Sequence, residues 1–376
     1  MRGTALVAGG GIGGLSAAIG LRKAGWEVRV LERAPEFTAV GAGISLWPNA
    51  LRALTELGLG PRLDPLLTPQ TSGGLLDQDG RWLTRWDAAV FERALGRPLV
   101  GIHRAHLLEL LLDALPDDCL EPGTTVGSAA ELDADLVVGA DGIHSRLRAE
   151  LHPGHPQPVY TGTTAFRGVT ARTDDVKLGV TMGPGVELGV VPLAGGDVYW
   201  YAAVSAPEGS TVDDPKAYLL DRFTGWRSKV PDLVARTETV LHHDIHWLAE
   251  PLPCYVGGNV ALLGDAAHAM PPFLGQGGCQ SIEDAVVLAA AAARHDSVAA
   301  VLAHYDRERR PRSQRIARNS ARMGRFGQQL EHPLAVRARN TLVRLLPVSL
   351  SVRGSIRMSD WTPPRIGAQS PTSPAS

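Results

Sequence analysis

The stretch VALLGDAAHAMPPFLGQGGCQSIEDA, residues 260–285, has the pattern of a strand, a turn and a helix that together could form one side of a ligand site. Residues 260–263 are a short apolar run typical of a buried strand, and Gly264-Asp265 predicts a sharp turn after it. GQGG at residues 275–278 then opens a predicted helix. An aspartate at the carboxyl end of a parallel strand points into the crevice where open α/β sheets bind ligands, and a helix N-terminus offers N–H groups to negative charge. An ordinary strand–loop–helix connection has the same pattern, so the choice depends on the rest of the chain.

The N-terminal segment carries a second motif. Residues 4–8 are an apolar run that predicts a buried parallel strand, and GGGIGG follows at residues 9–14. Gly9, Gly11 and Gly14 match G-x-G-x-x-G, in which the first glycine makes a tight turn, the second lets a pyrophosphate approach and the third packs helix on strand. Alone, this pattern is weak support, because tight turns also use glycine for their own packing.

A carboxylate after the next predicted strand strengthens this motif. Residues 27–31 form that strand, and Glu32 follows at about the 20-residue spacing at which an acidic side chain binds ribose hydroxyls. Strand, glycines, helix, second strand and Glu32 together predict a bound adenine dinucleotide. The alternative, a turn packed for its own sake, would leave Glu32 as a coincidence.

Two further segments carry side chains suited to a nucleotide. Residues 135–141, DLVVGAD, predict another buried strand ending in Asp141, although an aspartate there can also cap the helix that follows. Arg104 begins a predicted helix, where its guanidinium can donate two hydrogen bonds to a phosphate. The flanking His103 and His106 are interpreted as surface or capping residues.

The character of the sequence changes between residues 160 and 252. Alternating apolar runs separated by glycine-containing turns predict an antiparallel sheet inserted between the dinucleotide-binding segments. His242, Asp244 and His246 share one face of a predicted strand there. A metal site is one interpretation, but a solvated or hydrogen-bonded face is favoured, because three residues on one strand lack a further ligand. We therefore predict no metal.

Composition narrows the class of protein. The chain has 376 residues, 44% hydrophobic and 20% charged, which is typical of a globular protein with two lobes. A net charge of −2 gives no field for nucleic acid, and three widely spaced cysteines fit a reducing compartment, so a cytoplasmic protein is expected. No apolar run reaches the length of a membrane span.

Residues 307–325 are rich in arginine. They are interpreted as a solvated amphipathic helix that lies against the first lobe rather than as a nucleic-acid site, because acidic charge elsewhere in the chain balances them.

Together these motifs resemble the class A FAD-dependent aromatic monooxygenases of the para-hydroxybenzoate hydroxylase type. The resemblance rests on GGGIGG with Glu32, GADG at residues 139–142 and GDAAH with GQGG across residues 264–278, and it extends to about residue 325. The GDAAH…GQGGC pattern is similar to members such as FAD-dependent urate hydroxylase and zeaxanthin epoxidase. One departure is a short connection, residues 121–134, where the family usually has a small hairpin.

The resemblance implies a set of cofactor-binding residues. It assigns Glu32 to the adenosine ribose, Arg104 to a contact with FAD, and Asp141 to both FAD and the pyridine nucleotide. Asp265 would hold the ribityl chain, and the backbone of residues 275–278 would lie by the pyrimidine edge of the flavin. The complete set is Gly9, Gly11, Gly13, Gly14, Glu32, Arg33, Arg104, Asp141, Asp265, Gly275, Gly277 and Gly278.

The fold implied is α/β: a Rossmann-like FAD-binding domain with an inserted antiparallel-sheet substrate domain and C-terminal helices. The expected boundaries are residues 1–72, 96–158 and 253–305 for the FAD-binding domain, 73–95 and 159–252 for the substrate domain, 306–350 for the C-terminal helices and 351–376 for a disordered tail.

The activity implied is hydroxylation of a small aromatic or heteroaromatic substrate through a flavin hydroperoxide, with NADPH or NADH as transient reductant and dioxygen as co-substrate. A flavin-dependent epoxidase or dehydrogenase of the same fold, and a non-catalytic FAD-binding protein, are the alternatives. No catalytic residue is assigned; His242, His246, Tyr201 and Arg167 are unranked candidates for a substrate base. The expected partner is the small-molecule substrate, without nucleic acid or membrane, and the protein is expected to be a monomer or homodimer.

Overall fold

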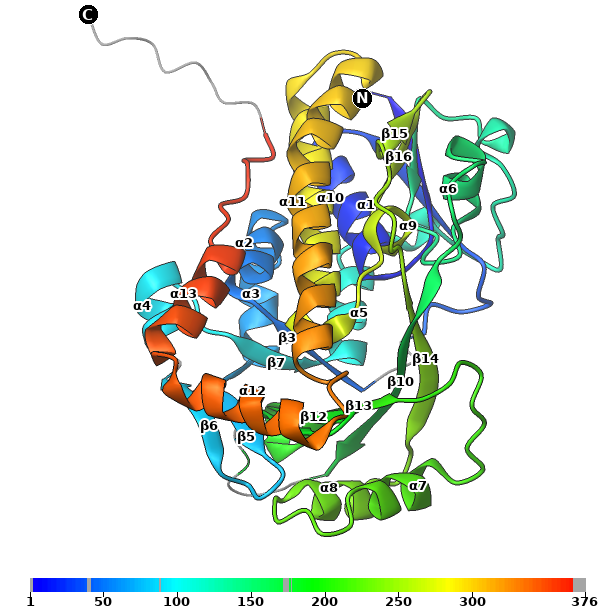
Figure 1. Cartoon of the computed structure of the whole chain (residues 1–376). Helices are drawn as coiled ribbons and strands as arrows, with labels where there is room; N and C mark the ends of the chain where they lie inside the picture. The colour runs from blue at the N-terminus through cyan, green and yellow to red at the C-terminus, as the bar shows by residue number, and fades with distance from the viewer. Residues whose placement is uncertain (1–2, 39–41, 88, 172–175, 177, 368–376) are drawn as a thin grey trace, which may run out of the picture.

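The computed structural model describes residues 3–38, 42–87, 89–171, 176 and 178–367. A mostly parallel sheet occupies the upper half of the view in Figure 1 and an antiparallel sheet the lower half, with long helices beside the first and short helices below the second. The fold class predicted from the sequence is confirmed by this arrangement.

The upper sheet has six strands in the order β15-β16-β9-β1-β2-β8. Its central strands are parallel and completely apolar at buried positions, because helices cover them. The carboxyl ends of β1, β9 and β16 therefore lie side by side. The strand bounds are β1 (Thr4–Ala8), β2 (Glu27–Glu32), β8 (Leu120–Pro122), β9 (Leu136–Gly139), β15 (Val256–Gly257) and β16 (Val260–Leu262).

The lower sheet has seven strands in the order β14-β10-β13-β12-β11-β5-β6. Alternate residues face opposite sides. Phe166, Leu188 and Trp200 face a buried core made with α7 and α8, whereas Tyr199 faces β3 of the upper half, where a Cβ on Gly43 would lie 2.6 Å from the Cβ of Tyr199. The bounds are β5 (Ser72–Asp77), β6 (Trp82–Asp87), β10 (Val159–Thr170), β11 (Gly179–Gly183), β12 (Val186–Pro192), β13 (Val198–Ser205) and β14 (Leu241–Trp247).

A small third sheet joins the two halves, and the helices complete the architecture. The third sheet is β3 (Gly43–Leu46), β7 (Val100–His103) and β4 (Thr68–Pro69). The helices are α1 (Ile12–Lys23), α2 (Pro48–Glu56), α3 (Gly60–Leu63), α4 (Ala89–Leu95), α5 (Arg104–Leu112), α6 (Arg146–Leu151), α7 (Pro215–Arg222), α8 (Val230–Arg236), α9 (Asp265–His268), α10 (Gly277–Arg294), α11 (Val298–Phe326), α12 (Pro333–Leu345) and α13 (Val348–Ser359).

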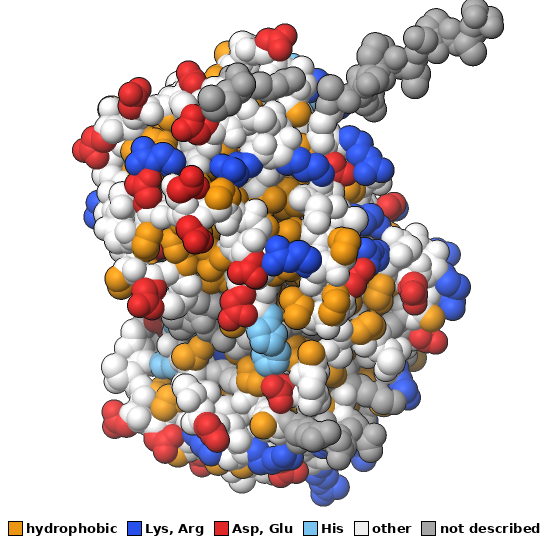
Figure 2. Space-filling model, turned by 180° about the vertical axis from the view of Figure 1, so that it is seen from behind, with side chains coloured by type: hydrophobic (Ala, Val, Ile, Leu, Met, Phe, Trp, Pro, Cys, Tyr) orange, Lys and Arg blue, Asp and Glu red, His pale blue; other side chains and the backbone are white. Residues whose placement is uncertain are grey.

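Helices α1, α10 and α11 form a packed layer beside the six-stranded sheet (Figure 1). The stretch that follows β16 thus leads through α9 directly into α10, at the centre of this layer. Among the described helices, none is both long enough and apolar enough to cross a bilayer. Seen from behind, acidic and basic side chains are interspersed over the surface (Figure 2).

The C-terminal segment corrects one prediction. A disordered tail was expected over residues 351–376, but α13 extends to Ser359 and the chain stays packed to residue 367. Arg52 donates hydrogen bonds to the carbonyl oxygens of Ser359 and Trp361, and the N–H of Ile366 donates to Glu56. The polar, proline-containing composition was misleading because these backbone groups bond to side chains of the first lobe. Residues 368–376 lie outside the described part.

The short connection at residues 121–134 also has a defined structure. It leaves β8 alongside β2, with the N–H of Thr124 donating to the carbonyl oxygen of Glu32, and then makes a single 3₁₀ turn at Ala129–Glu131. Within this connection the residues form no further strand after β8.

Candidate functional site

The glycine-rich turn after β1 is shaped by close backbone contacts. Gly9 has a φ of 112°, and a Cβ there would lie 2.2 Å from the carbonyl oxygen of Ala140. A Cβ on Gly14 would lie 2.0 Å from the carbonyl oxygen of Gly9, so neither position accepts a side chain. At Gly11, by contrast, a Cβ would meet no atom within 4 Å. The turn thus packs tightly on its inner side and is open in front of Gly11.

This open side is the N-terminus of α1. Gly11 is its N-cap, no side chain caps the helix, and its first turn holds no acidic residue. The first N–H groups of a helix lack intrahelical partners, and they attract anions together with the helix dipole. Gly13 makes a different contact, since a Cβ there would lie 2.7 Å from Leu263 and 3.0 Å from Ser281. Gly13 therefore allows α1 to approach β16 and α10.

Glu32 lies at the mouth of the same turn. One carboxylate oxygen accepts a hydrogen bond from the N–H of Gly10 at 2.7 Å, and the other accepts from the N–H of Ala34 at 2.8 Å. These bonds fix the carboxylate, and its remaining lone pairs leave capacity for hydroxyl donors. Arg33 follows with an exposed side chain that has no hydrogen bond to any described residue.

Asp141 fits both interpretations made from the sequence. Its Oδ2 accepts hydrogen bonds from the N–H groups of Arg146 (2.8 Å) and Leu147 (3.3 Å), so it helps to cap the start of α6 together with the N-cap residue Ser145. Its Oδ1 is buried and has no partner among the described residues. Buried polar atoms are normally hydrogen-bonded, so this oxygen is available to a bound ligand.

The turn after β16 presents Asp265 without a partner. Gly264 has a φ of 62°, and its N–H donates to Asp284 Oδ2 of α10 at 3.0 Å. The Asp265 side chain is exposed and makes no hydrogen bond with any part of the described chain. Its carboxylate is therefore not required for packing and is free to accept hydrogen bonds from a ligand.

The N-terminus of α10 faces this turn. Gly275 has a φ of 60°, a Cβ on Gly277 would meet no atom within 4 Å, and one on Gly278 would meet Ile44 at 2.9 Å. Two buried amide atoms here, Nε2 of Gln276 and Oδ1 of Asn49, have no hydrogen-bond partner among the described residues. One is a donor and the other an acceptor, so they suit a flat heterocycle whose edge offers both.

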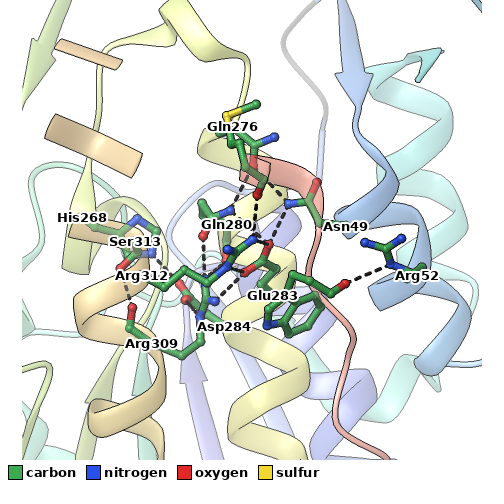
Figure 3. Close-up of polar contacts among 12 residues, drawn as sticks. Asn49, Arg52, His268, Gln276, Gln280, Glu283, Asp284, Arg309, Arg312 and Ser313 are labelled. Carbon is green, nitrogen blue, oxygen red and sulfur yellow. Dashed lines mark hydrogen bonds and ion pairs between the residues drawn. The ribbon is translucent and has the colours of Figure 1, made fainter. Parts of the chain in front are cut away.

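A buried charge network supports this helix, and the sequence analysis missed it (Figure 3). Arg309 of α11 donates through Nε to Asp284 at 2.7 Å and through a terminal nitrogen to Glu283. Arg312 donates to both oxygens of Glu283 at 2.7 Å, and His268 Nε2 lies 2.6 Å from Asp284 Oδ2. Burial alone would raise the pKa of Glu283 and Asp284, but the neighbouring cations hold both below the usual range.

The network connects the turn, the helix and α2. Asp284 holds the N–H of Gly264, while Asn49 of α2 donates to Glu283 at 2.7 Å and to Gln276 at 3.1 Å. Figure 3 shows these side chains converging on Glu283 from three helices. The position of the Asp265 turn relative to the α10 N-terminus is therefore set by a buried polar framework.

The arginine-rich segment was predicted wrongly in one respect. It was interpreted as a solvated helix, but Arg309 is 1% exposed and each nitrogen of its guanidinium donates a hydrogen bond. Arg315 and Arg318 on the same helix are exposed, as expected. The signal that could have identified Arg309 is the Glu283-Asp284 pair inside an otherwise apolar helix, because buried carboxylates require cations.

The face of the lower sheet that meets the upper half carries a second group of polar residues. Arg167, Tyr199 and Tyr201 lie on this face, beside Arg104 of α5. Burial and the nearby Arg167 lower the pKa of Arg104, while Asp265 and Tyr199 act in the opposite direction. The Arg104 guanidinium has no hydrogen bond to any residue in the described ranges. A half-buried cation without a hydrogen-bond partner suits a ligand that carries negative charge or a strong acceptor.

The four unranked candidates for a substrate base separate onto two faces. Arg167 and Tyr201 are paired across β10 and β13 and face the upper half. His242 stacks on Phe166, whose side chain belongs to the core under the opposite face, and His246 lies on the same side of β14 as His242. The structure thus brings Arg167 and Tyr201 near Arg104 and places both histidines away from it.

The histidine strand has separate partners for each side chain. His242 Nε2 lies 2.8 Å from the Thr164 hydroxyl, Asp244 accepts from the N–H of Gly209 at 2.7 Å, and His246 lies 2.8 Å from Glu208. Among the residues that the structure describes, no group of three or more His, Cys, Asp or Glu side chains is arranged to hold a metal. The absence of a metal requirement stays a prediction.

Glu187 is a further residue that the sequence analysis missed. It is 4% exposed on the same face of β12, and Tyr201 Oη lies 3.3 Å from its Oε1. Burial raises the pKa of Glu187 to about 7, although Tyr201 and Arg339 lower it. Burial also holds the pKa of Tyr201 well above its usual range. The pair can therefore hold a proton at neutral pH on the sheet face that also carries Arg167.

Glu187→Gln is expected to change how stability depends on pH. Because the folded pKa lies above the value of 4.5 for an exposed glutamate, the carboxyl contributes its full stability below that pH and loses it as pH rises through about 7. The wild type should therefore lose about 2–4 kcal/mol relative to Glu187→Gln between pH 5 and pH 8. Urea unfolding at both pH values measures this. The exposed Glu250→Gln is the matched control, and parallel stability curves for wild type and Glu187→Gln would contradict the assignment.

The open helix N-terminus, the fixed Glu32 carboxylate and the Asp265 turn lie at the carboxyl edge of one parallel sheet, an arrangement typical of dinucleotide-binding oxidoreductases. The FAD binding domain family matches residues 2–108 and 123–320 of the chain. The chain therefore belongs to the FAD-dependent monooxygenase family, as the motifs indicated.

Individual relatives support this membership. The chain is 38% identical to the aurachin C monooxygenase/isomerase of Stigmatella aurantiaca over 91% of its own length and 94% of that protein. It is 34% identical to the FAD-dependent urate hydroxylase of Klebsiella oxytoca, covering 81% of the chain and 85% of the relative. The structure of Klebsiella pneumoniae HpxO complexed with FAD and uric acid is similar with a TM-score of 0.88 and 28% identity, covering 95% of this chain and 96% of that one. FAD as the cofactor is thereby confirmed.

Proposed function

We propose that this protein is an NAD(P)H-dependent FAD monooxygenase that hydroxylates a small aromatic or heteroaromatic substrate. The observation that carries the proposal is the proximity of Asp265 and Arg104, two charged side chains that make no hydrogen bond with any described residue. Asp265 belongs to the upper half, and Arg104 is close enough to Asp265, Arg167 and Tyr199 for all three to affect its pKa. A cofactor on one side and a substrate on the other would complete these groups.

The residues around the glycine turn would hold FAD. Gly9, Gly11 and Gly14 shape a helix N-terminus for the pyrophosphate, and Glu32 accepts the adenosine ribose hydroxyls. Asp265 accepts the ribityl hydroxyls. Bound FAD would supply two-electron transfer from a nicotinamide and the activation of dioxygen, while the protein binds, orients and excludes water. Asp141, with its orphaned Oδ1, is proposed to serve the pyridine nucleotide as well.

The substrate would bind on the inner face of the seven-stranded sheet. Tyr199 and Tyr201 offer two aromatic rings whose centroids lie 6.4 Å apart, and Arg104 and Arg167 offer positive charge. This combination suits a planar ring with an ionisable oxygen or nitrogen. Glu187 can accept a proton through Tyr201 Oη when such a ring is deprotonated. The relatives named as acting on urate and on 3-amino-4-hydroxybenzoate are consistent with this chemical class.

The remaining assignments are proposals of the same kind. The chain has no second G-x-G-x-x-G unit after a strand, so NADPH or NADH would bind transiently in a shared groove. The division into FAD-binding and substrate domains follows the two large sheets. The three free cysteines support a cytoplasmic enzyme, and we propose a monomer or homodimer.

One experiment separates the proposed function from its alternatives. The purified protein is examined for flavin absorbance, NADPH and NADH oxidation is screened against an aromatic panel, and products formed under labelled dioxygen are identified. Incorporation of one labelled oxygen as a ring hydroxyl supports the proposal, and an epoxide product supports the epoxidase. Oxidised product without label supports a dehydrogenase. Bound flavin with no compound accelerating nicotinamide oxidation supports a non-catalytic flavoprotein.

Asp265→Ala is expected to weaken FAD binding by about 1–3 kcal/mol, because ribityl hydroxyls lose a charged acceptor. The fold should be unaffected, since this side chain is exposed and bonds to no described residue. Flavin content after purification and titration of the apoprotein with FAD measure the effect.

Asp141→Ala is the contrasting variant. It removes a helix cap, so stability should fall by about 1 kcal/mol, while flavin is retained better and the rate of flavin reduction by NADPH falls. Rapid-mixing reduction kinetics test this. A wild-type reduction rate in Asp141→Ala together with full flavin content in Asp265→Ala would refute the division of roles.

A further inference from the structure

The C-terminal helices carry a concentration of exposed apolar side chains. Nine large apolar side chains are exposed among the described residues, and eight of them lie between residues 323 and 350. Single exposed apolar residues are ordinary, but a contiguous group marks an interaction surface. The eight are Met323, Phe326, Leu334, Leu342, Leu345, Leu346, Val348 and Leu350, with Leu345 77% and Leu334 66% exposed.

The geometry of α12 makes this group a stripe. Leu334, Leu342 and Leu345 recur at helical spacing on the side opposite the buried Val336 and Arg339, which face the body of the protein. Helix α12 is held against the body of the protein, because Arg339 donates a hydrogen bond to the carbonyl oxygen of Gly327 at 2.7 Å.

The stripe continues around the corner between α12 and α13. Leu346, Val348 and Leu350 are exposed in and after the turn. Val352 of α13 is buried, and this helix contacts α4 and β6. Figure 1 shows the two helices along the outer edge of the molecule, meeting at a corner. We define residues 333–357 as the C-terminal corner.

The charged side chains within the corner segment itself all have one sign. Residues 332–359 contain five arginines and no aspartate or glutamate. Arg344 pairs with Asp77, and Arg339 is buried. Arg337, Arg353 and Arg357 are exposed and form no ion pair with any residue that the structure describes. Leu350, Arg353 and Arg357 share one face of α13, so cations border the apolar stripe directly.

This combination of apolar and cationic side chains favours a lipid surface over a second copy of the protein as the partner. Helices that lie in a bilayer interface bury leucine-rich faces at the boundary of the headgroups and place arginines on lipid phosphates. A symmetric contact with a second copy would set these arginines against each other, because a two-fold interface joins a patch to itself. We propose that the C-terminal corner docks the protein onto the surface of an anionic lipid bilayer. This mode is adsorption without spanning, and it does not depend on the proposed function.

The test is co-sedimentation of the full chain with vesicles of phosphatidylglycerol and phosphatidylcholine, compared with phosphatidylcholine alone. The wild type should bind the anionic vesicles preferentially, and added salt should weaken the binding. Arg353→Glu and Arg357→Glu should each lower the partition coefficient by at least about fivefold, the contribution of one cation near such a surface. The double variant Leu345→Glu/Leu350→Glu should lower it tenfold or more.

Matched variants control for charge and hydropathy elsewhere. Val159→Glu alters the one exposed large apolar residue outside the group, and Arg22→Glu reverses an exposed arginine at the end of α1. Both should bind as the wild type does, and unfolding curves establish that all variants are folded. Equal binding to neutral and anionic vesicles, or equal losses in corner and control variants, would overturn the proposal. So would a dimer that Leu345→Glu dissociates while vesicles fail to bind, since that identifies a second copy as the partner.

Discussion

Arg309→Met is expected to lower the free energy of unfolding by about 3–5 kcal/mol, because it breaks a buried charge network. Methionine fills part of the volume but leaves the fully buried Glu283 and Asp284 without the cation that bonds to both. Arg312 and His268 remain as partners, each for only one of the two carboxylates. An uncompensated buried carboxylate either stays charged at high cost or takes up a proton, and both outcomes destabilise the fold at neutral pH.

The same substitution should reach the cofactor site. Asp284 accepts the N–H of Gly264, and Glu283 holds Asn49 beside the α10 N-terminus, so a disturbed network displaces the turn that presents Asp265. Flavin content should therefore fall together with stability.

Chemical unfolding of Arg309→Met is to be compared with Arg310→Met. Arg310 is adjacent on α11 and pairs with Asp306 at the surface, so its loss should cost about 1 kcal/mol or less. A double variant, Arg309→Met with Asp284→Asn, should recover part of the stability, because residue 284 then carries no charge while Glu283 keeps its ion pair with Arg312. Equal costs for the two arginine variants would mean that the buried network does not contribute as described.

Local patterns were sufficient to predict the framework of the cofactor half. The apolar run before Gly9 and the one before Gly264 are buried strands because helices cover both faces, and such strands have a recognisable composition. The glycine positions follow from short-range sterics, as the 2.0 Å approach at Gly14 shows. Each of these features depends on residues close in the sequence, which is why one sequence was enough.

The missed features depend on contacts between distant segments. Arg309 meets Asp284 across 25 positions, and Glu187 is buried by strands and helices that the sequence does not bring together locally. The C-terminal residues 360–367 look like a tail until Glu56 and Arg52 supply partners for their backbone. Burial of a charged residue cannot be read from its own segment, because the compensating group lies elsewhere in the chain.

The structure agrees with some of the cofactor-site residues proposed from the sequence better than with others. The structure places Glu32, Asp141 and Asp265 at the carboxyl ends of β2, β9 and β16, strands of one parallel sheet, which is consistent with their proposed roles. It gives Gly13 a packing contact instead of an open face, and it gives the Arg33 side chain no hydrogen bond or ion pair with any described residue. The direct test of the glycine roles is a pair of identical substitutions at Gly14 and Gly11.

Gly14→Ala is expected to destabilise the protein by about 1–3 kcal/mol or more, because its Cβ would lie 2.0 Å from the carbonyl oxygen of Gly9 and 3.3 Å from Ala140. A backbone atom cannot rotate away as a side chain can, so the turn or α1 must move. The prediction opposes helix propensity, which favours alanine over glycine inside a helix by about 1 kcal/mol. A net loss would therefore be evidence for the close approach itself.

Gly11→Ala makes the same chemical change with a different expected result. Gly11 has a φ of −77°, which alanine adopts readily, and its Cβ would meet no protein atom within 4 Å, so stability of the apoprotein should stay within about 0.5 kcal/mol of the wild type. The methyl group would project into the space proposed for the pyrophosphate, so FAD affinity should fall at least tenfold. Thermal unfolding of the apoproteins and FAD titration separate the two effects. Unchanged FAD affinity in Gly11→Ala would place the pyrophosphate elsewhere, and wild-type stability in Gly14→Ala would show that the turn can relax around a side chain.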